Sequence, residues 1–316
     1  MTSAANPLSG RRVPAMSALL SAIVVLLLVA AAPALADSTW VGGGSDSNWS
    51  TATNWQNGTG PAASTADGTL TFPSMSCSST CASTDDLSGV SLTGLTIDAK
   101  TSYNVTGNAV TLGSGGISTT GGGSNLAASW SAPIALNGSQ TWSIGGGGQL
   151  AMDGAISGAS DAVTVDFSGF DSILAINSDD EIGPVTASGG GFLSLDGGAS
   201  LNGTDGNAVS LTSGSYLQEI GNATLGPLTV TGSNIGVGGA FSVDNLTVNG
   251  TASIDGASTT TFGLGASTGS QLSASGNVSL GGSVSLETCS ALTPGTTYTL
   301  VQSTGGSLSG TFSNAP

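Results

Sequence analysis

The chain contains no histidine, and its three basic residues are Arg11, Arg12 and Lys100. Without histidine, neither a Ser-His-Asp nor a Cys-His nucleophile system can be assembled. Lyases that abstract a proton with an arginine or lysine base would have only Lys100 beyond the N-terminal segment. The composition therefore excludes the hydrolase and lyase mechanisms that depend on a basic side chain.

Charge is also scarce, since charged residues make up 7% of the chain and the formal net charge is −16. This negative field disfavours nucleic acids, anionic membranes and acidic polymers as partners, whereas cationic ligands such as Ca²⁺ suit it. Aromatic residues make up only 5% of the chain. Helix formers are few, and no amphipathic stretch of helical period follows the N-terminal segment. The class predicted is all-β.

Residues 1–36 have the features of a secretory signal peptide. Arg11 and Arg12 precede the apolar run of residues 19–32, and Ala34-Leu35-Ala36 provides small residues for cleavage. The alternative is a membrane anchor, but a spanning helix needs about 20 apolar residues and this run is shorter. We therefore expect a secreted, extracellular or cell-surface protein of residues 37–316, with a formal charge of −18.

A short unit recurs along the chain, an apolar-polar-apolar run stopped by glycine. It occurs as LTVTG at 228–232 and LTVNG at 246–250, and in related form at 185–189 and 272–276. The starting positions are 43, 18 and 26 residues apart, which corresponds to one or two turns of roughly 20 residues in a β-solenoid. Most other apolar runs also alternate with period two. The sequence predicts a single-domain parallel β-helix of roughly a dozen turns.

Three tryptophans lie close together near the start of the mature chain, at Trp40, Trp49 and Trp55. The first turn of a solenoid has an uncovered apolar end, and bulky side chains can cap it. The alternative role is a platform on which carbohydrate rings stack. We expect residues 37–90 to form this cap and the first turns, and residues 91–316 to form the β-helix.

The tryptophan pattern, followed by the strand-like run 67–73, resembles the start of bacterial autotransporter-passenger-like extracellular β-helix proteins. Residues 292–301 and 308–316 resemble the closing turns of the same proteins. The resemblance implies a right-handed helix. Because further residues normally follow such closing turns, it also implies that this chain is truncated at its C-terminal end.

Two of the three cysteines, Cys77 and Cys81, are predicted to form a local disulfide in a secreted chain. Cys289 would lie some 50 Å from them if the turns stack at about 4.8 Å, which is far beyond disulfide reach. We therefore expect its partner to lie outside this chain.

The densest acidic cluster is Asp179-Asp180-Glu181, preceded by Asn177. Glycoside hydrolysis needs only carboxyl groups, so Asp179, Asp180, Glu181 and the nearby Asp166 are the candidate catalytic residues. The alternatives are a solvated turn or a structural calcium site formed by Asn177, Asp179, Asp180 and Glu181, which all carry hard oxygen ligands. Asp85-Asp86 is a second acidic pair.

These features together favour a structural or adhesin-like protein without catalytic activity and with no cofactor beyond a structural calcium ion. Its partners would be cell-surface glycans, or the surface of a host or neighbouring cell. The alternative function is a polysaccharide hydrolase that uses carboxyl groups on a β-helix scaffold.

Overall fold

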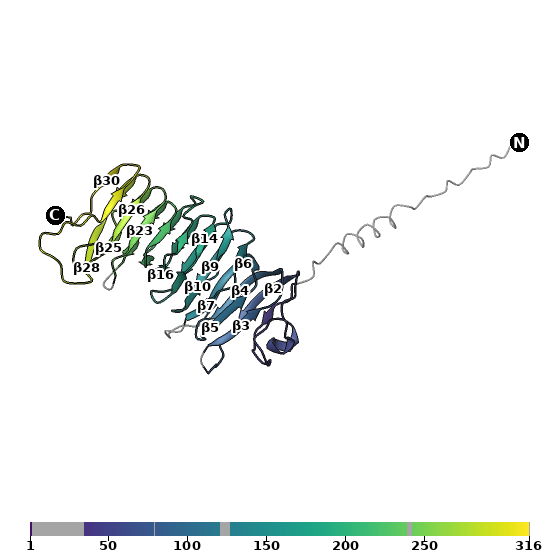
Figure 1. Cartoon of the computed structure of the whole chain (residues 1–316). Coiled ribbons are helices and arrows are strands. Elements are labelled where there is room, and N and C mark those ends of the chain that lie inside the picture. The colour runs from purple at the N-terminus through teal and green to yellow at the C-terminus, as the bar shows by residue number, and fades with distance from the viewer. Residues whose placement is uncertain (2–34, 79, 121–126, 239–241, 316) are drawn as a thin grey trace. The chain divides into compact units, whose positions relative to one another are not determined.

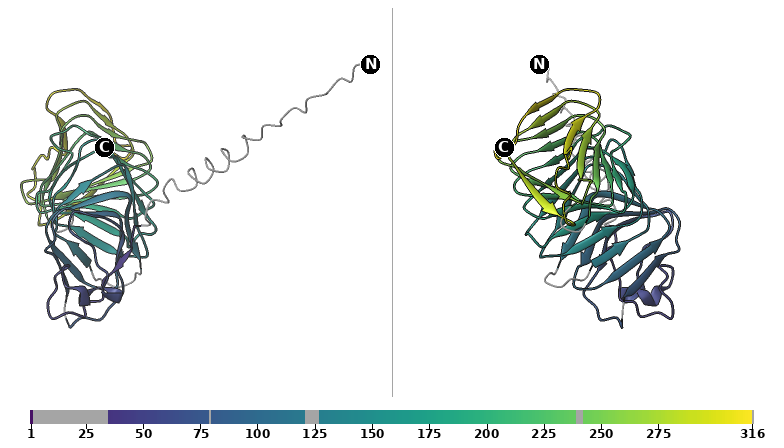
Figure 2. Two further views of the ribbon diagram at one scale, coloured as in Figure 1. Left: turned by 90° about the vertical axis from the view of Figure 1, so that its right-hand side faces the viewer. Right: turned by 60° about the vertical axis from the view of Figure 1, so that its left-hand side comes forward.

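The computed structural model describes residues 1, 35–78, 80–120, 127–238 and 242–315. The signal peptide predicted for residues 1–36 lies almost entirely outside these ranges. Residues Ala36–Pro316 form one compact unit. This unit is a right-handed β-solenoid of about nine turns, whose parallel strands stack as successive rungs (Figures 1 and 2). Within the described ranges, no helix is long and apolar enough to cross a membrane.

One side of the solenoid, here called face 1, is a ten-stranded parallel sheet. Its strands are β3 (Cys81–Asp85), β5 (Tyr103–Gly107), β7 (Ala127–Trp130), β10 (Gln149–Met152), β13 (Ile173–Ile176), β16 (Phe192–Asp196), β19 (Tyr216–Ile220), β22 (Asn234–Val237), β25 (Thr259–Leu264) and β28 (Ser283–Thr288).

A twenty-stranded sheet forms the other two sides, face 2 and face 3. It begins with β1 (Ser38–Thr39), β2 (Ala66–Phe72), β4 (Val90–Asp98) and β6 (Val110–Thr120). Face 2 continues through β8 (Ile134–Leu136), β11 (Ile156–Gly158), β14 (Asp179–Ile182), β17 (Ser200–Leu201), β20 (Ala223–Leu225), β23 (Asn245–Val248), β26 (Gln271–Ala274) and β29 (Val301–Ser303). Face 3 continues through β9 (Gln140–Ile144), β12 (Val163–Phe167), β15 (Val185–Ser188), β18 (Val209–Leu211), β21 (Leu228–Val230), β24 (Ala252–Ile254), β27 (Val278–Leu280) and β30 (Leu308–Gly310).

Faces 2 and 3 form one sheet because β6 spans both of them. Its residues Val110–Leu112 pair with β8, and its residues Ile117–Thr119 pair with β9. Two short 3₁₀ helices, η1 (Ala52–Asn54) and η2 (Gln56–Gly58), precede β2.

The core is built from aliphatic residues that stack in register from turn to turn. On face 1, Leu150, Leu174, Leu193, Leu217 and Ile235 are successive partners, and all are buried. The alternation within each strand produces this arrangement, since every second side chain points inward. The period-two pattern therefore predicted the class and the core side of the strands correctly.

Turn length is not constant, so the spacing of the repeated unit does not give the length of a turn directly. On face 1 the partners Leu193, Leu217, Ile235 and Thr260 are separated by 24, 18 and 25 residues. Longer turns explain why the solenoid has about nine of them rather than a dozen. The units at 185 and 228 both lie on face 3, two turns apart, as predicted. The step from 228 to 246 is not a turn, because the units at 246 and 272 lie on face 2.

The three N-terminal tryptophans pack inside the first turns, with exposed fractions of 1% for Trp40, 1% for Trp49 and 2% for Trp55. The rings of Trp40 and Trp55 meet edge to face with centroids 5.0 Å apart, and those of Trp49 and Trp55 at 5.9 Å. Trp49 also donates its indole N–H to the Ser83 hydroxyl at 2.7 Å. Stacking of a sugar needs an exposed ring face, which these side chains do not offer.

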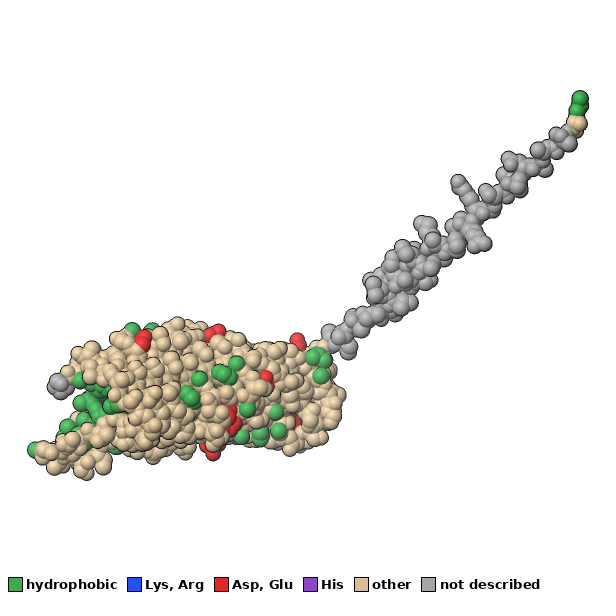
Figure 3. Space-filling view, turned by 90° about the horizontal axis from the view of Figure 1, so that it is seen from above, with side chains coloured by type: hydrophobic (Ala, Val, Ile, Leu, Met, Phe, Trp, Pro, Cys, Tyr) green, Lys and Arg blue, Asp and Glu red, His purple; other side chains and the backbone are tan. Residues whose placement is uncertain are grey.

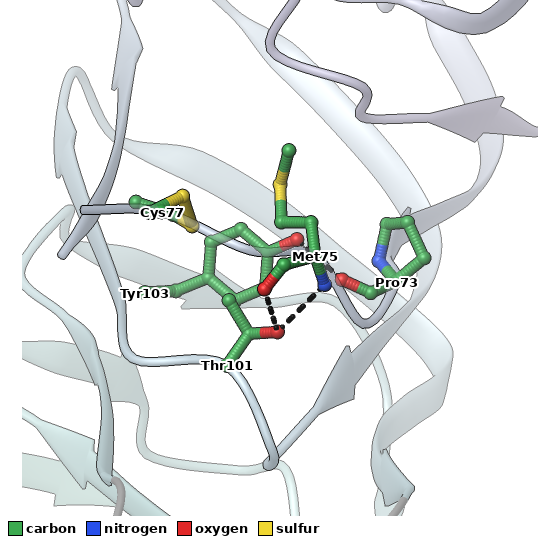
Figure 4. Close-up of a disulfide and its surroundings, with 6 residues drawn as sticks. Pro73, Met75, Cys77, Thr101 and Tyr103 are labelled. Carbon is green, nitrogen blue, oxygen red and sulfur yellow. Dashed lines mark hydrogen bonds between the residues drawn. A yellow bond between two sulfur atoms is a disulfide. The ribbon is translucent and has the colours of Figure 1, made fainter. Parts of the chain in front are cut away.

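A loop after β2 is tied to the following turn and carries the Cys77–Cys81 disulfide (Figure 4). Met75 and Thr101 exchange two hydrogen bonds, because the Met75 N–H donates to Thr101 Oγ1 and this hydroxyl donates to the Met75 carbonyl. The Tyr103 hydroxyl donates to the Pro73 carbonyl at 2.5 Å. The disulfide is thus one of several contacts that hold this loop.

Replacing both Cys77 and Cys81 by serine is expected to lower the free energy of unfolding by about 2 kcal/mol or less. The closed loop is short, so the disulfide restricts the unfolded chain only a little, and the bonds to Thr101 and Tyr103 remain. Denaturant unfolding of the oxidised protein and the double variant measures the difference. Loss of the folded state in the double variant would contradict this expectation.

The last turn is more open than the first. Leu286 in β28 is 52% exposed and Leu308 in β30 is 51% exposed, and apolar side chains are visible at this end of the solenoid in Figure 3.

Candidate functional site

The acidic cluster Asp179-Asp180-Glu181 lies within strand β14 on face 2, not in a turn. Alternation along the strand therefore separates its members. Asp180 points inward and is fully buried, whereas Asp179 is exposed and Glu181 is partly exposed. The three carboxyl groups do not converge on one point outside the solenoid. Within the described residues, no group of three or more His, Cys, Asp or Glu side chains is arranged to hold a metal ion.

Asp180 accepts hydrogen bonds from its own turn and from the preceding turn. Its Oδ1 accepts the Ile156 N–H at 2.6 Å and the Ser178 hydroxyl at 2.9 Å. Burial raises the pKa of Asp180 to about 6, partly opposed by these two hydrogen bonds. Its other oxygen, Oδ2, is buried without a hydrogen-bond partner. Such a group has a perturbed pKa, but no access to a polymeric substrate.

Glu181, Asn177 and Asp166 are hydrogen-bonded to residues of neighbouring turns. Burial tends to raise the pKa of Glu181, but hydrogen bonds from Thr204 and Asp205 outweigh this effect and lower the pKa. The Asn177 amide donates to Asp153 Oδ1 at 2.7 Å. Asp166 lies on face 3 in β12, where it accepts the Ser188 hydroxyl at 2.9 Å. The structure thus places Asp166 and the β14 carboxyl groups on different faces.

The second acidic pair, Asp85-Asp86, is divided in the same way. Asp85 is buried at the end of β3, and burial raises its pKa to about 6, opposed by the Leu87 N–H and reinforced by Asp86. Asp86 is exposed and accepts hydrogen bonds from the Ser50 N–H and hydroxyl. Its pKa is lowered because these bonds outweigh the effect of burial. Here too one of two sequence neighbours is buried and the other is exposed.

A file of hydroxyl groups runs along the outside of face 3, and the sequence did not reveal it. Its members are in register from turn to turn and are at least partly exposed: Thr141, Thr164, Thr186, Ser210, Thr229, Ser253, Ser279 and Ser309. Figure 3 shows a surface that is largely polar and uncharged, with separate acidic side chains. The hydroxyl file of face 3 and the side of the molecule shown in Figure 3 are therefore rich in hydrogen-bonding groups and poor in charge.

Phe192 and Tyr216 on the outside of face 1, together with Phe170 in the turn that precedes this face, form what we call the aromatic surface. Phe192 and Tyr216 are register partners on β16 and β19, with ring centroids 5.1 Å apart. Phe170 precedes β13 and is 77% exposed, and its ring lies over Gly190, two residues before Phe192. These rings come from three consecutive turns.

Glycine makes room for the ring of Tyr216 on the next turn. A Cβ atom at Gly236 would lie 2.6 Å from the Tyr216 hydroxyl oxygen, so a side chain here would displace the ring. The hydroxyl also takes part in a hydrogen bond with the side chain of Thr261. The ring of Tyr216 is therefore positioned by the two turns that follow it.

Sequence reasoning missed the aromatic surface, although a local signal for part of it exists. Leu193 and Leu195 alternate with Phe192, and Leu217 alternates with Tyr216, so period two already places both aromatic rings opposite the core. Their proximity depends on the number of residues in the intervening turn, which sequence did not reveal.

Comparison with known proteins does not assign this chain to a family: a scan for protein families, a search of curated proteins and a search of solved structures each found no match.

Proposed function

We propose that this chain is a secreted or cell-surface β-helix of the autotransporter-passenger kind, which acts as a non-catalytic, adhesin-like module and binds neutral glycans through the aromatic surface. The observation that carries the proposal is the pair of aromatic side chains on the outside of face 1, with the exposed Phe170 in the turn before it, in a chain with few aromatic residues.

The chemistry of the aromatic surface suits a sugar. The faces of a pyranose ring carry C–H groups, which pack against aromatic rings, while its hydroxyls need hydrogen-bonding partners at the edges. Phe192 and Tyr216 provide adjacent rings, and Gln218 lies on the outer side of the same strand as Tyr216. Rungs of a β-sheet repeat at about 4.8 Å, so a chain of sugars can contact several turns in succession.

The charged residues around the aromatic surface limit the kind of glycan that it is expected to bind. The nearest charged residues in sequence and register are acidic, with Asp171 beside Phe170 and Asp196 at the end of β16. Glu287 raises the pKa of Tyr216, although burial has the larger effect. These carboxylates repel uronic acids and sulfated sugars, so neutral glycans are the expected ligands.

Non-catalytic binding is supported by the placement of the candidate catalytic residues. Asp180, which has the raised pKa expected of a general acid, is buried and bonded within the fold. General acid–base catalysis requires the carboxyl group to reach the glycosidic oxygen. Asp166, another of the four candidates, lies on face 3, away from the carboxyl groups of β14.

Replacing Phe170 or Tyr216 by alanine is expected to weaken binding to a neutral polysaccharide by about 5- to 10-fold, because each substitution removes one stacking surface. Tyr216→Phe, which keeps the ring, should retain most of the affinity. The measurement is a binding isotherm for each variant with the glycan selected from a panel of neutral and acidic polysaccharides.

The matched control is Ile220→Ala, since Ile220 is an apolar residue, 43% exposed, on the same strand as Tyr216. It should bind like the original protein. Equal losses in the control would indicate a general apolar effect and contradict sugar stacking. Release of sugar that disappears in Asp179→Asn or Asp180→Asn would replace the proposal by the hydrolase alternative.

A further inference from the structure

Four buried carboxyl groups in this protein each have one oxygen without a hydrogen-bond partner among the described residues, namely Asp85 Oδ2, Asp180 Oδ2, Glu219 Oε1 and Asp244 Oδ2. A buried carboxylate needs a proton, a cation or hydrogen-bond donors. From residue 35 onward the chain contains a single basic residue, Lys100, which is exposed. Among the described residues, no side chain is therefore placed to supply the compensating cation.

Glu219 and Asp244 differ from the other two because each has a second buried carboxyl group close to it. Glu219 is fully buried and Asp244 is 9% exposed. Burial raises the pKa of Glu219 to about 7, and the charge of Asp244 contributes to this increase. By contrast, the acidic neighbours of Asp180 and Asp85 are solvent-accessible side chains.

Gly238 lies at the centre of this arrangement, at the corner between faces 1 and 2. Its N–H donates to Glu219 Oε2 at 3.0 Å. A Cβ atom on Gly238 would lie 2.7 Å from the Ser242 carbonyl oxygen and 3.1 Å from the Asp244 nitrogen. Gly238 also has a φ of +65°, which favours glycine. The backbone thus brings the Glu219 carboxyl group and the Ser242–Asp244 segment to one corner.

Among the described residues, no group forms a hydrogen bond to Glu219 Oε1 or to Asp244 Oδ2, although the Asn222 N–H, like that of Gly238, lies close enough to the Glu219 carboxyl group to oppose the increase in its pKa. The Asp244 N–H donates to Ser270 Oγ at 3.1 Å, so this bond involves the backbone and not the carboxylate. The Cys289 thiol donates to the Ser242 carbonyl at 3.1 Å. A carbonyl oxygen has two lone pairs, so Ser242 can accept this bond and still face a cation.

We propose that Glu219 and Asp244 bind a calcium ion at this corner, with the Ser242 carbonyl oxygen as a further ligand and water completing the coordination. Ca²⁺ accepts carboxylate, carbonyl and water oxygens in irregular arrangements, whereas Mg²⁺ demands a near-octahedral set. One proton could neutralise only one of the two carboxylates, but a divalent cation neutralises both. With two protein carboxylates, the dissociation constant is expected to be on the order of 10⁻⁴–10⁻³ M, as in extracellular calcium modules.

The experiment is thermal unfolding of the full chain at about pH 8, in EDTA and then in about 10 mM CaCl₂, together with calorimetric titration of CaCl₂. Calcium is expected to raise the melting temperature by about 3 °C and to show saturable binding. Glu219→Gln and Asp244→Asn should each abolish both effects. Asp180→Asn is the matched control, a buried carboxyl group without a second buried acid beside it, and should keep both effects.

Each test substitution removes a buried charge and preserves the shape of the side chain, so the variants should be at least as stable as the original protein in EDTA. Loss of the calcium response would then report the site and not unfolding. The proposal is overturned if calcium leaves the original protein unchanged, or if Glu219→Gln retains the response. The result is independent of glycan binding, which is measured with different variants.

Discussion

Acidifying a calcium-free solution of this protein from about pH 8 to about pH 5 is expected to stabilise the fold by on the order of 5 kcal/mol, or about 10 °C in melting temperature. The pKa values of Asp85 and Asp180 are raised from 3.8 to about 6, and that of Glu219 from 4.5 to about 7, in each case chiefly by burial. One pKa unit corresponds to about 1.4 kcal/mol.

The sign of the effect follows from proton binding. Between about pH 4 and pH 7 the native chain holds protons on these three carboxyl groups that the unfolded chain has already lost. Their contribution to stability is therefore fully present below the unfolded pKa values, and it is lost as the pH rises through the folded values. Most proteins lose stability in acid because their carboxylates are paired with cations, whereas this chain has only three basic residues.

Glu219→Gln and Asp180→Asn test the assignment, since each should flatten the pH dependence and raise the melting temperature at about pH 8. Asp255→Asn serves as the control. The Ser258 hydroxyl and neighbouring N–H groups lower the pKa of Asp255, so its small effect has the opposite sign. A melting temperature that falls steadily from about pH 8 to about pH 5 would show that these groups are not buried as described.

Replacing Trp49 by alanine is expected to cost about 3–5 kcal/mol of unfolding free energy, as for other buried aromatic residues. The ring packs against Trp55, Phe72 and Trp130, with centroid distances of 5.9, 6.5 and 6.3 Å. Its removal would leave a cavity in the first turns and would also leave Ser83 Oγ without its donor. Trp49→Phe should cost less, because it retains much of the ring volume.

Denaturant unfolding measures the total loss, and hydrogen exchange shows where the loss occurs. Turns of a solenoid contact mainly their neighbours, so the early strands β2 to β5 should lose protection before the later ones. The control is Phe170→Ala, an aromatic residue that is 77% exposed and should change stability by no more than about 0.5 kcal/mol. Equal losses in the two variants would contradict a capping role for Trp49.

Much of the fold could be predicted because the governing pattern is local. Runs such as Val163–Phe167 alternate apolar and polar residues, and the apolar set has to be buried whatever the rest of the chain does. Glycine after such runs ends the strand. The first turn of a solenoid has an apolar end that no neighbouring turn covers, so a cap of bulky side chains was likewise predictable.

The candidate site was less predictable, even where a local rule applied. Asp180 shares its side of the strand with Ile182, so period two alone places it in the core and apart from Asp179 and Glu181. From the sequence, the acidic run is interpreted as one cluster of candidate catalytic residues, with a calcium site or a solvated turn as the alternatives. The cluster is divided because a pleated strand sends neighbouring side chains to opposite sides.

By itself the sequence determined the all-β class, the inward and outward sets within each strand and the scarcity of cations. The tertiary structure alone decided which residues of different turns meet: the rings of Phe192 and Tyr216, the hydroxyl file of face 3, and the corner shared by Glu219 and Asp244. The physical reason is that alternation acts within a strand, whereas contacts between turns depend on turn lengths that range from 18 to 25 residues on face 1.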